Sequence, residues 1–416
     1  MKPKALLFLL KGGGIFKKRE PLPKQSPGIQ RQLDIYQKGI LGRKPTFPVQ
    51  IEVLERLARQ KLSREAYDYV AGGAGGERTM SANLRAFDHW RIVPGHLRNI
   101  AERDLRITLF GQSLSVPFLL APIGVQGIIH RDGEVAVAGA AASLNVPLVL
   151  STASSRTMED VALAMGKTQH WFQLYWPKDP ELARSFIKRA ELSSYSALVV
   201  TLDTSLLSWR ERDIHNAYLP FLTGDGLANY FSDPIFRSAL AQPPEKAPLD
   251  AVRHFARLFS NPSLAWNDLK WLRKQTKLPI LLKGILHVDD ARAALRYGVD
   301  GIIVSNHGGR QVDGAIAALD ALPAIVKAVG SRTTILFDSG IRRGSDIFKA
   351  IALGAKAVLL GRPYIWGLAV GGEKGVRHVL ENLIADTDLT LGLGGYSSFS
   401  QLQGDSVARS ATTLPG

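Results

Sequence analysis

Cysteine is absent from this sequence of 416 residues. Its absence excludes disulfides, thiolate nucleophiles, iron–sulfur clusters and zinc sites with cysteine ligands. Redox chemistry in this chain would therefore need an organic cofactor. No metal site is predicted.

Long hydrophobic runs are also absent. The run nearest the start, Ala5–Leu10, spans six residues, whereas a membrane helix needs about 20 and a signal peptide also needs a longer core. We therefore expect neither a membrane span nor secretion. The last residues, Thr413–Gly416, do not form a peroxisomal address, so the expected location is cytoplasmic.

Acidic residues are too few to balance the basic ones, and the formal net charge is +15. Such an excess fits nucleic acid, an anionic surface or small anionic ligands as partners. Part of it lies in the first twenty residues, where Glu20 is the single acid. We interpret residues 1–45 as a flexible basic arm. Nucleic acid is not an expected partner, because no motif with basic and aromatic residues interleaved occurs.

Apolar residues, by contrast, make up 45% of the chain, enough for one large core. From Val116 onward the sequence repeats a short apolar run, a polar or glycine stop and a helical stretch, which is typical of βα units. Eight such runs predict a (β/α)8 barrel, with a six-stranded open α/β sheet as the alternative. The expected strands are 116–121, 146–150, 170–175, 197–203, 278–284, 301–307, 333–338 and 357–361.

Other segments lie outside these regular units. Residues 47–99 are predicted to form a mainly helical lead-in. Residues 215–262 are a long loop insertion rich in Pro, Asn and Asp, and because they follow the C-terminal end of the fourth strand we predict a lid over the active face. The expected organisation is one barrel domain over residues 46–405, followed by a tail at 406–416.

Nearly every expected strand ends in a polar or charged side chain, and in a barrel these ends meet at the rim that carries the chemistry. After the sixth strand come His307, a candidate base, and Arg310, a cation suited to a carboxylate. Asp203, at the end of the fourth strand, can orient His307 and favour its protonated form. Further candidates for contacts with a carboxylic acid substrate are Tyr69, Tyr175 and Arg210.

The loops after the seventh and eighth strands combine glycines with Arg342 and Arg362, a pattern typical of a phosphate site. The alternative is that these arginines pair with surface carboxylates. We favour a phosphorylated cofactor or substrate.

The remaining strand ends fit a flat heterocycle. Ser151, Gln173 and Thr201 can bind its polar edge, and Lys283 can stabilise negative charge on the ring. A flavin matches this set. Pyridoxal phosphate also uses a barrel lysine and a phosphate site, so Lys283 as a Schiff-base residue is the competing hypothesis.

The motifs at these strand ends resemble those of the FMN-dependent enzymes that oxidise L-2-hydroxy acids, and the resemblance runs from about Leu54 to Leu402. It includes Tyr67-Asp68-Tyr69, Ala121-Pro122, Phe172-Gln173-Leu174-Tyr175, Thr201-Leu202-Asp203-Thr204, Lys283-Gly284, Ser305-Asn306-His307-Gly308-Gly309-Arg310-Gln311, Arg342-Arg343-Gly344 and Gly361-Arg362-Pro363. The resemblance implies a barrel fold, FMN as cofactor, a 2-hydroxy acid and O2 as reactants, and a homo-oligomer of four or more chains. It disfavours pyridoxal phosphate.

The resemblance also implies a role for each matching residue. His307 would be the active-site base, assisted by Asp203, and Lys283 would face N1 and O2 of the flavin. The implied substrate-binding residues are Tyr69, Tyr175, Arg210 and Arg310. The implied cofactor-binding residues are Pro122, Ile123, Gly124, Ser151, Gln173, Thr201, Lys283, Ser305, Asp338, Gly340, Arg342, Gly361 and Arg362.

Within the family the sequence is most similar to the lactate 2-monooxygenase branch, through Leu207–Asp213 and the insertion segment Asn229–Pro234. Gly124 stands where glycolate oxidase and lactate oxidase have alanine, and a missing methyl near flavin N5 would change the room for keto product and oxygen species to stay together. The predicted reaction is oxidation of L-lactate to acetate, CO2 and water. Ala153, where glycolate oxidase has an aromatic residue, implies a side-chain pocket that admits more than lactate.

Other outcomes stay open at this point. Within the family, the alternatives are a peroxide-producing oxidase and a dehydrogenase that uses another acceptor. From different classes, the alternatives are a flavin-binding barrel without turnover and an isomerase acting on a phosphorylated substrate.

Overall fold

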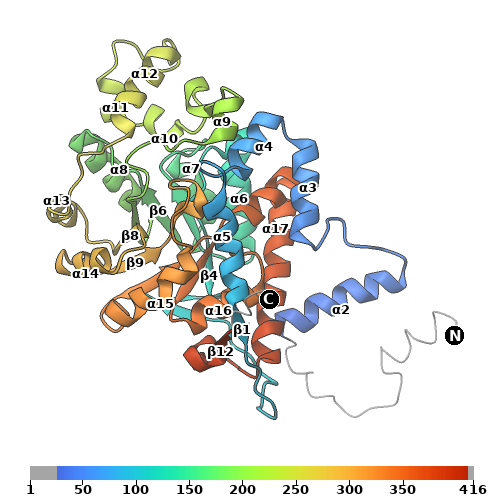
Figure 1. Ribbon diagram of the computed structural model, residues 1–416. Coiled ribbons are helices and arrows are strands. Elements are labelled where there is room, and N and C mark those ends of the chain that lie inside the picture. The colour runs from blue at the N-terminus through green and yellow to red at the C-terminus, as the bar shows by residue number, and fades with distance from the viewer. Residues whose placement is uncertain (1–25, 411–416) are drawn as a thin grey trace.

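The computed structural model describes residues 26–410. Its centre is a closed barrel of eight parallel strands, in which each strand pairs with the next along the chain and β11 pairs with β4 (Figure 1). The closed barrel is confirmed, and the open sheet is excluded. The strands are β4 (Phe118–Leu120), β5 (Leu148–Ser151), β6 (His170–Leu174), β7 (Leu198–Thr201), β8 (Ile280–Ile285), β9 (Gly301–Val304), β10 (Thr334–Phe337) and β11 (Ala357–Leu360).

The barrel interior is filled by an apolar layer to which all eight strands contribute. It includes Leu119, Val149, Trp171, Val199, Leu281, Ile303 and Leu336, and β11 contributes both Ala357 and Leu359. Their neighbours along each strand face the surrounding helices instead, because side chains alternate between the two faces of a strand.

A hairpin closes one end of the barrel. Its strands are β2 (Ile107–Leu109) and β3 (Gln112–Leu114), and Leu109 and Leu114 join the interior layer. Phe110 at its tip lies with its ring centroid 5.9 Å from that of Trp171. It also approaches Gly301, the first residue of β9, so the sealed end is the one at which the strands begin. The end at which the strands finish is left for the site.

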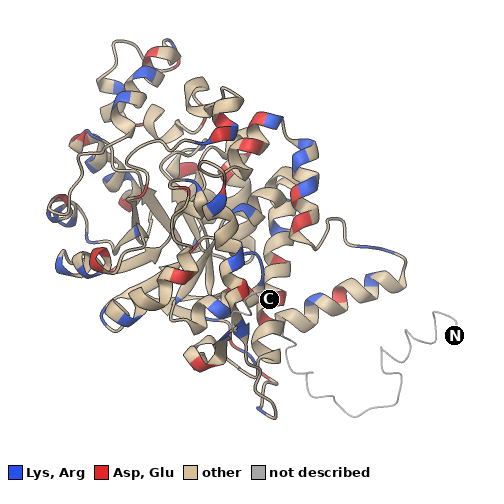
Figure 2. Ribbon diagram, in the orientation of Figure 1, with Lys and Arg blue, Asp and Glu red and all other residues tan. Residues whose placement is uncertain are grey.

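The outer ring is formed by helices that follow or precede each strand. They are α6 (Gly133–Ser143), α7 (Met158–Met165), α8 (Pro180–Leu192), α13 (Asp268–Gln275), α14 (Val288–Arg296), α15 (Ala318–Val329), α16 (Gly344–Ala352) and α17 (Arg362–Leu393). Charged residues concentrate on these helices and on the loops, while the central strands carry few (Figure 2). Within the described range, no helix combines the length and apolar character needed to cross a bilayer.

The lead-in is helical, as expected. It contains α3 (Ile51–Lys61), α4 (Arg64–Ala71), α5 (Arg78–Ala86) and the 3-10 turn η1 (Phe87–His89). The arm was expected to be flexible to residue 45, but it contains α2 (Pro27–Ile40), which packs on α17 (Figure 1). Gly28 N donates to Asp388 Oδ2 at 3.0 Å, and Asp388 also forms a buried ion pair with Arg103 at 2.9 Å. The most basic part of the predicted arm, residues 1–25, lies outside the described range.

The predicted tail also differs from the structure. Strand β12 (Val407–Arg409) pairs antiparallel with β1 (Trp90–Ile92), so the lead-in and the end of the chain are joined in a small sheet. The tail therefore begins no earlier than residue 410.

The insertion after β7 is folded rather than an open loop. It contains α9 (Glu211–His215), η3 (Pro220–Thr223), α10 (Ala228–Phe231), α11 (Pro234–Ser238) and α12 (Pro248–Phe259). Tyr230 is its aromatic centre, with ring centroids 5.0 Å from Phe186 on α8 and 4.9 Å from Phe255. Asp233 caps α11 and accepts from Arg189 of α8 at 3.0 Å. These contacts fix the insertion on the barrel, and its movement as a lid stays a prediction.

Candidate active site

The C-terminal ends of the strands surround one cavity of about 1070 Å³, counted to its open mouth. Asp203, Gln173 and Ser305 lie one layer behind the cavity, each hydrogen-bonded to a lining residue. Thr201 borders a neighbouring cavity instead. The predicted site residues that line the main cavity are Tyr69, Pro122, Ile123, Gly124, Ser151, Tyr175, Arg210, Lys283, His307, Arg310, Asp338, Gly340, Arg342, Gly361 and Arg362.

His307 opens a tight turn directly after β9. The turn, η4 (His307–Gly309), has positive φ at all three residues, 59°, 65° and 79°, a conformation that glycine adopts most readily. Gly309 also lies against α5, where an added Cβ would be 2.6 Å from the backbone of Met80. The two glycines therefore allow the backbone to hold His307 at the rim.

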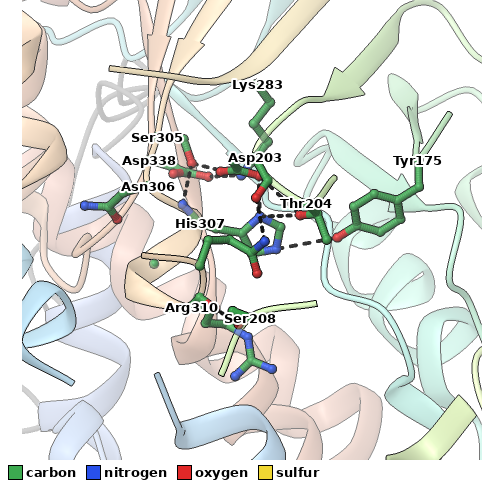
Figure 3. Close-up of polar contacts among 12 residues, drawn as sticks. Tyr175, Asp203, Thr204, Ser208, Lys283, Ser305, Asn306, His307, Arg310 and Asp338 are labelled. Atoms are coloured by element: carbon green, nitrogen blue, oxygen red, sulfur yellow. Dashed lines mark hydrogen bonds and ion pairs between the residues drawn. The ribbon is translucent and has the colours of Figure 1, made fainter. Parts of the chain in front are cut away.

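The imidazole of His307 is held from its rear side by Asp203. His307 Nδ1 lies 2.8 Å from Asp203 Oδ1, and Thr204 Oγ1 lies 3.4 Å from the same nitrogen. On the cavity side, His307 Nε2 lies 3.5 Å from the hydroxyl of Tyr175 (Figure 3). The carboxylate thus fixes the proton on Nδ1 and leaves Nε2 free to accept one.

The pKa of His307 is lowered. Burial is the largest cause, and the charge of Lys283 adds to it, while Asp203 opposes both. The sequence led us to expect that Asp203 would favour the protonated ring, but burial outweighs that effect. Asp203 itself has a lowered pKa, because the charges of His307 and Lys283 overcome its own burial. At neutral pH the pair is a carboxylate and a neutral imidazole, the state that a general base requires.

Lys283 is a buried cation beside the pair. Its Nζ lies 3.1 Å from Asp338 Oδ2 and donates to Ser305 Oγ at 2.9 Å. Burial lowers the pKa of Lys283, but Asp338 and Asp203 more than offset it, so the pKa is raised. A permanently charged ammonium at this place can stabilise negative charge on a neighbouring ring. A Schiff-base role would require the neutral amine instead.

Two arginines, Arg310 and Arg210, form a cationic part of the cavity that suits a carboxylate. Arg310 donates to the carbonyls of Tyr69 and Gly72 at 2.6 and 2.8 Å and lies over the Tyr69 ring at 5.1 Å. Arg210 donates to Gln311 at 3.0 Å and to the Arg310 carbonyl at 3.3 Å. Burial and the charge of Arg210 lower the pKa of Arg310 to about 10, so both guanidiniums are charged and an anionic substrate would relieve their repulsion.

A second group of cations lies near the loops after β10 and β11, next to Arg310, because Arg362 and Arg310 donate to the same Gly72 carbonyl. Arg362 donates to the carbonyls of Val70, Gly72 and Gly308 at 2.9 to 3.1 Å. Burial, together with Arg310 and Arg342, lowers the pKa of Arg362 to about 9. Buried cations held mainly by neutral carbonyls create a site for an anion such as phosphate.

One buried amide supports a heterocycle between these regions. Gln173 Oε1 accepts from Ser151 Oγ at 3.1 Å and from Thr152 N at 3.2 Å, but Gln173 Nε2 is buried without a partner among residues 26–410. A buried donor without an acceptor is costly, and a ring nitrogen or carbonyl would satisfy it. The cationic phosphate region, Lys283 and this amide together fit a flavin mononucleotide.

Several residues at the site were not found from the sequence. Asn83 on α5 forms a reciprocal amide pair with Asn306 at 2.7 and 2.8 Å, which ties the lead-in to the catalytic turn. Ser339 Oγ accepts from Gly308 N at 3.0 Å. Phe221 and Phe259 of the insertion line the cavity. The sequence gives no local pattern for these residues, because the residues that each of them contacts at the site are more than thirty positions away along the chain.

Gly124 packs against the next βα loop. A Cβ built on Gly124 would lie 2.5 Å from the Ala153 carbonyl oxygen and 3.1 Å from its Cβ, and Val125 N donates to the same carbonyl at 2.8 Å. The absence of a Cβ at Gly124 therefore lets the two loops approach each other closely. Its effect on the room for keto product and oxygen species stays a prediction.

The barrel, the phosphate region and the base define a flavin-dependent oxidoreductase of the α/β-barrel class. A family model described as FMN-dependent dehydrogenase matches residues 58–409. The chain belongs to this family, its cofactor is FMN, and it is an oxidoreductase of the 2-hydroxyacid oxidase and dehydrogenase group.

The relatives support the assignment along nearly the whole chain. An FMN-dependent alpha-hydroxy acid dehydrogenase of Penicillium citrinum is 46% identical over 382 residues, covering 91% of this chain and 95% of that protein. An L-lactate oxidase of Lysinibacillus sphaericus (strain C3-41) is 43% identical over 370 residues, covering 89% and 95%. The crystal structure of a mandelate oxidase is similar with a TM-score of 0.78 and 37% identity, covering 88% of this chain and all of that one.

Proposed function

We propose that this enzyme oxidises a small L-2-hydroxy acid, L-lactate in the first instance, with O2 as the acceptor, and that its products are those of a lactate 2-monooxygenase. The observation that carries the proposal is His307, half-buried and backed by Asp203 at 2.8 Å, in the same cavity as Arg310 and Arg210. An acid-binding pair of cations next to a base suits a substrate that carries both a carboxylate and an adjacent hydroxyl.

The roles of the residues follow from this arrangement. Arg310 and Arg210 bind the carboxylate, and Tyr69 and Tyr175 supply hydroxyl contacts. The substrate proton passes to Nε2 of His307, and Asp203 stabilises the imidazolium that forms. When bound, FMN would accept two electrons; Lys283 would stabilise negative charge on its ring, and Arg342 and Arg362 would hold its phosphate.

Gly124 supports the monooxygenase outcome over the oxidase outcome. Close packing of its turn on Ala153 favours a tight cavity in which keto acid and peroxide stay together. Pyruvate and hydrogen peroxide then react to acetate, CO2 and water: the C1–C2 and O–O bonds break, C2 becomes the carboxyl carbon of acetate, C1 leaves as CO2, and the two electrons given up by these carbons reduce the peroxide oxygens. An oxidase would release both, and a dehydrogenase would pass the electrons to another acceptor.

One sequential experiment tests the proposal. The holoenzyme is mixed anaerobically with L-lactate, the flavin absorbance is followed, and air is then admitted while acetate, pyruvate and peroxide are assayed. Bleaching followed by acetate is the expected result. Bleaching followed by stoichiometric pyruvate and peroxide identifies an oxidase, reoxidation only by an added dye or quinone identifies a dehydrogenase, and no bleaching contradicts lactate as substrate.

Cytoplasmic location and a homo-oligomer of four or more chains also stay proposals. The oligomer derives from the family resemblance, and the location is the expectation stated for the sequence. Cell fractionation and light scattering of the holoenzyme test them, with a monomer mass contradicting the second.

A further inference from the structure

A second cavity adjoins the active site on the side of the insertion. It encloses about 1020 Å³, counted to its mouth, between the segment after β6, the end of β7 and residues 259–269. Tyr175, Thr204 and Phe259 line this cavity and the active-site cavity alike. The partition between the two spaces is therefore a single layer of side chains.

One wall of this second cavity is apolar, while Thr201, Ser205, Asn261 and Asp290 add polar groups to its lining. Trp176 and Leu269 are buried in its wall, and Leu202 and Leu264 are half-buried beside them. Trp176 is braced from behind by Trp271, with ring centroids 5.6 Å apart. At its outer part the cavity reaches solvent-exposed residues such as Pro262. A channel of this kind suits an alkyl chain or aryl group, because apolar surface gains free energy when it leaves water.

Phe259 is held firmly in the partition. It is the last residue of α12, and the residues on both sides of it are tied to the segment after β6: Lys178 N donates to the Leu258 carbonyl at 3.0 Å, and Asn261 Nδ2 donates to the Pro177 carbonyl at 3.3 Å. Its ring centroid lies 5.2 Å from that of Tyr175. Phe259 is therefore a fixed wall.

The other two partition residues belong to the chemistry. Tyr175 and Thr204 both approach the imidazole of His307, at 3.5 and 3.4 Å. Phe259 contributes only an apolar ring to the partition, so its size can set how long a substrate side chain the cavity accepts without altering the base.

We propose that Phe259 is a specificity-determining residue, which closes the side-chain end of the active site and restricts the enzyme to short 2-hydroxy acids, and that the cavity behind it is an alkyl subsite which a smaller residue at this position would open. The proposal rests on the proposed oxidation of 2-hydroxy acids. It concerns side-chain length and not the reaction outcome with oxygen.

The test compares chain length in wild type and F259A. Anaerobic flavin reduction is measured with L-lactate, L-2-hydroxyhexanoate and L-2-hydroxyoctanoate, and kcat/KM for each long acid is divided by that for lactate. In wild type this ratio should be well below one. In F259A it should rise by about fourfold for each methylene that enters the apolar channel, giving a gain of tens of fold for the octanoate.

Phe221 provides the matched control. It is an aromatic residue of the same insertion that lines the active-site cavity, 5.5 Å from the Phe259 ring centroid, but it does not line the second cavity. F221A should leave the chain-length ratio near that of wild type. A gain equal to that of F259A would overturn the proposal, since it would show that any added volume is sufficient.

Leu264 allows the subsite to be refilled. It lines the second cavity and not the active site, so L264W alone should oxidise lactate as wild type does, while F259A/L264W should lose the gain for long acids. F259L, which keeps an apolar side chain in the wall, provides a milder variant with an intermediate gain.

The outcomes separate the two proposals. If F259A and F259L retain yellow FMN and are reduced by lactate but keep the wild-type ratio, the role of Phe259 is overturned and the proposed function stands. If no 2-hydroxy acid bleaches the wild-type flavin, the proposed function is wrong and this proposal falls with it.

Discussion

The two ends of the barrel are built from opposite chemistry, although the same strands supply both. On β8, Leu281 belongs to the apolar layer, and Lys283, two residues later, reaches the site. On β9, Ile303 and Ser305 repeat this relation. Side chains two residues apart lie on the same face of a strand. The first residue of each pair belongs to the apolar layer inside the barrel, here called the lower layer, and stabilises the fold. The second residue belongs to the polar side chains at the strand ends, here called the upper layer, and is a buried polar group that stability alone would not favour.

This difference predicts separable effects. Substitutions in the upper layer should change the reaction and leave the free energy of unfolding nearly unchanged. Substitutions in the lower layer should do the reverse. The four predictions below test that separation, beginning with the largest expected effect.

Replacement of the base should have the largest effect on the reaction. For H307Q we expect the rate constant of flavin reduction by L-lactate to fall by about 10²- to 10⁴-fold, since a general base contributes about that much. The amide is similar in size, so FMN content and the urea midpoint should match wild type. Stopped-flow absorbance measures the rate, and an unchanged rate would remove His307 from the role of base.

In the lower layer the largest side chain is Trp171. W171A should lower the free energy of unfolding by about 3 to 5 kcal/mol, the usual cost of such a cavity. KM for lactate should stay within about twofold of wild type, because Trp171 lies below the site. Urea unfolding and steady-state kinetics measure the two quantities. A large change in KM together with a small loss of stability would contradict the separation.

The carboxylate region should show a smaller loss. In R310K the planar fork is replaced by a point charge, so one charge-assisted hydrogen bond worth about 1.5 to 3 kcal/mol is lost. We expect kcat/KM for lactate to fall by roughly 10- to 150-fold, mainly through KM. R342K is the matched variant in the phosphate region, and it should weaken FMN retention rather than KM. If R310K instead weakened FMN retention and R342K raised KM, Arg310 would belong to the phosphate region and Arg342 to the carboxylate region.

The pH dependence should show the smallest effect. Because burial lowers the pKa of His307 from its usual value of 6.5, the rate of flavin reduction should be constant around pH 7 and should fall on the acid side, below pH 6.5, as the base is protonated. D203N removes the group that raises this pKa and should move the acid limb to still lower pH. Rates measured from pH 5 to pH 8 test this, and an acid limb moving upward in D203N would contradict the derived electrostatics.

The sequence predicted the polar side chains at the strand ends better than the residues that hold them in place. The strand ends carry His307, Arg310 and Lys283 directly after apolar runs, and the regular alternation of a strand determines which side chains share the rim. Asn83 could not be found in this way, because its partner Asn306 is 223 residues away and an amide pair has no local pattern. Thr201 borders the second cavity instead of the first, so its contact with the cofactor stays a prediction.

Composition was a poor guide to the insertion and the arm. Proline, asparagine and aspartate in residues 215–262 indicated a loop, but Pro234 and Pro248 begin short helices, Asp233 caps one of them, and an aromatic cluster holds them together. The cationic start of the chain led us to extend the flexible arm too far. Gly28 allows α2 to lie against Asp388, and such long-range contacts override local charge.

The contact between Gly124 and Ala153 has a consequence for how this sequence can evolve. Alanine at position 124 is incompatible with the present place of the Ala153 carbonyl, 2.5 Å away, so that substitution carries a penalty until the second loop has moved. The two positions are thus epistatic, and the order of substitutions matters. A lineage that first enlarged residue 153 would reach different neighbours in sequence space from one that first altered residue 124.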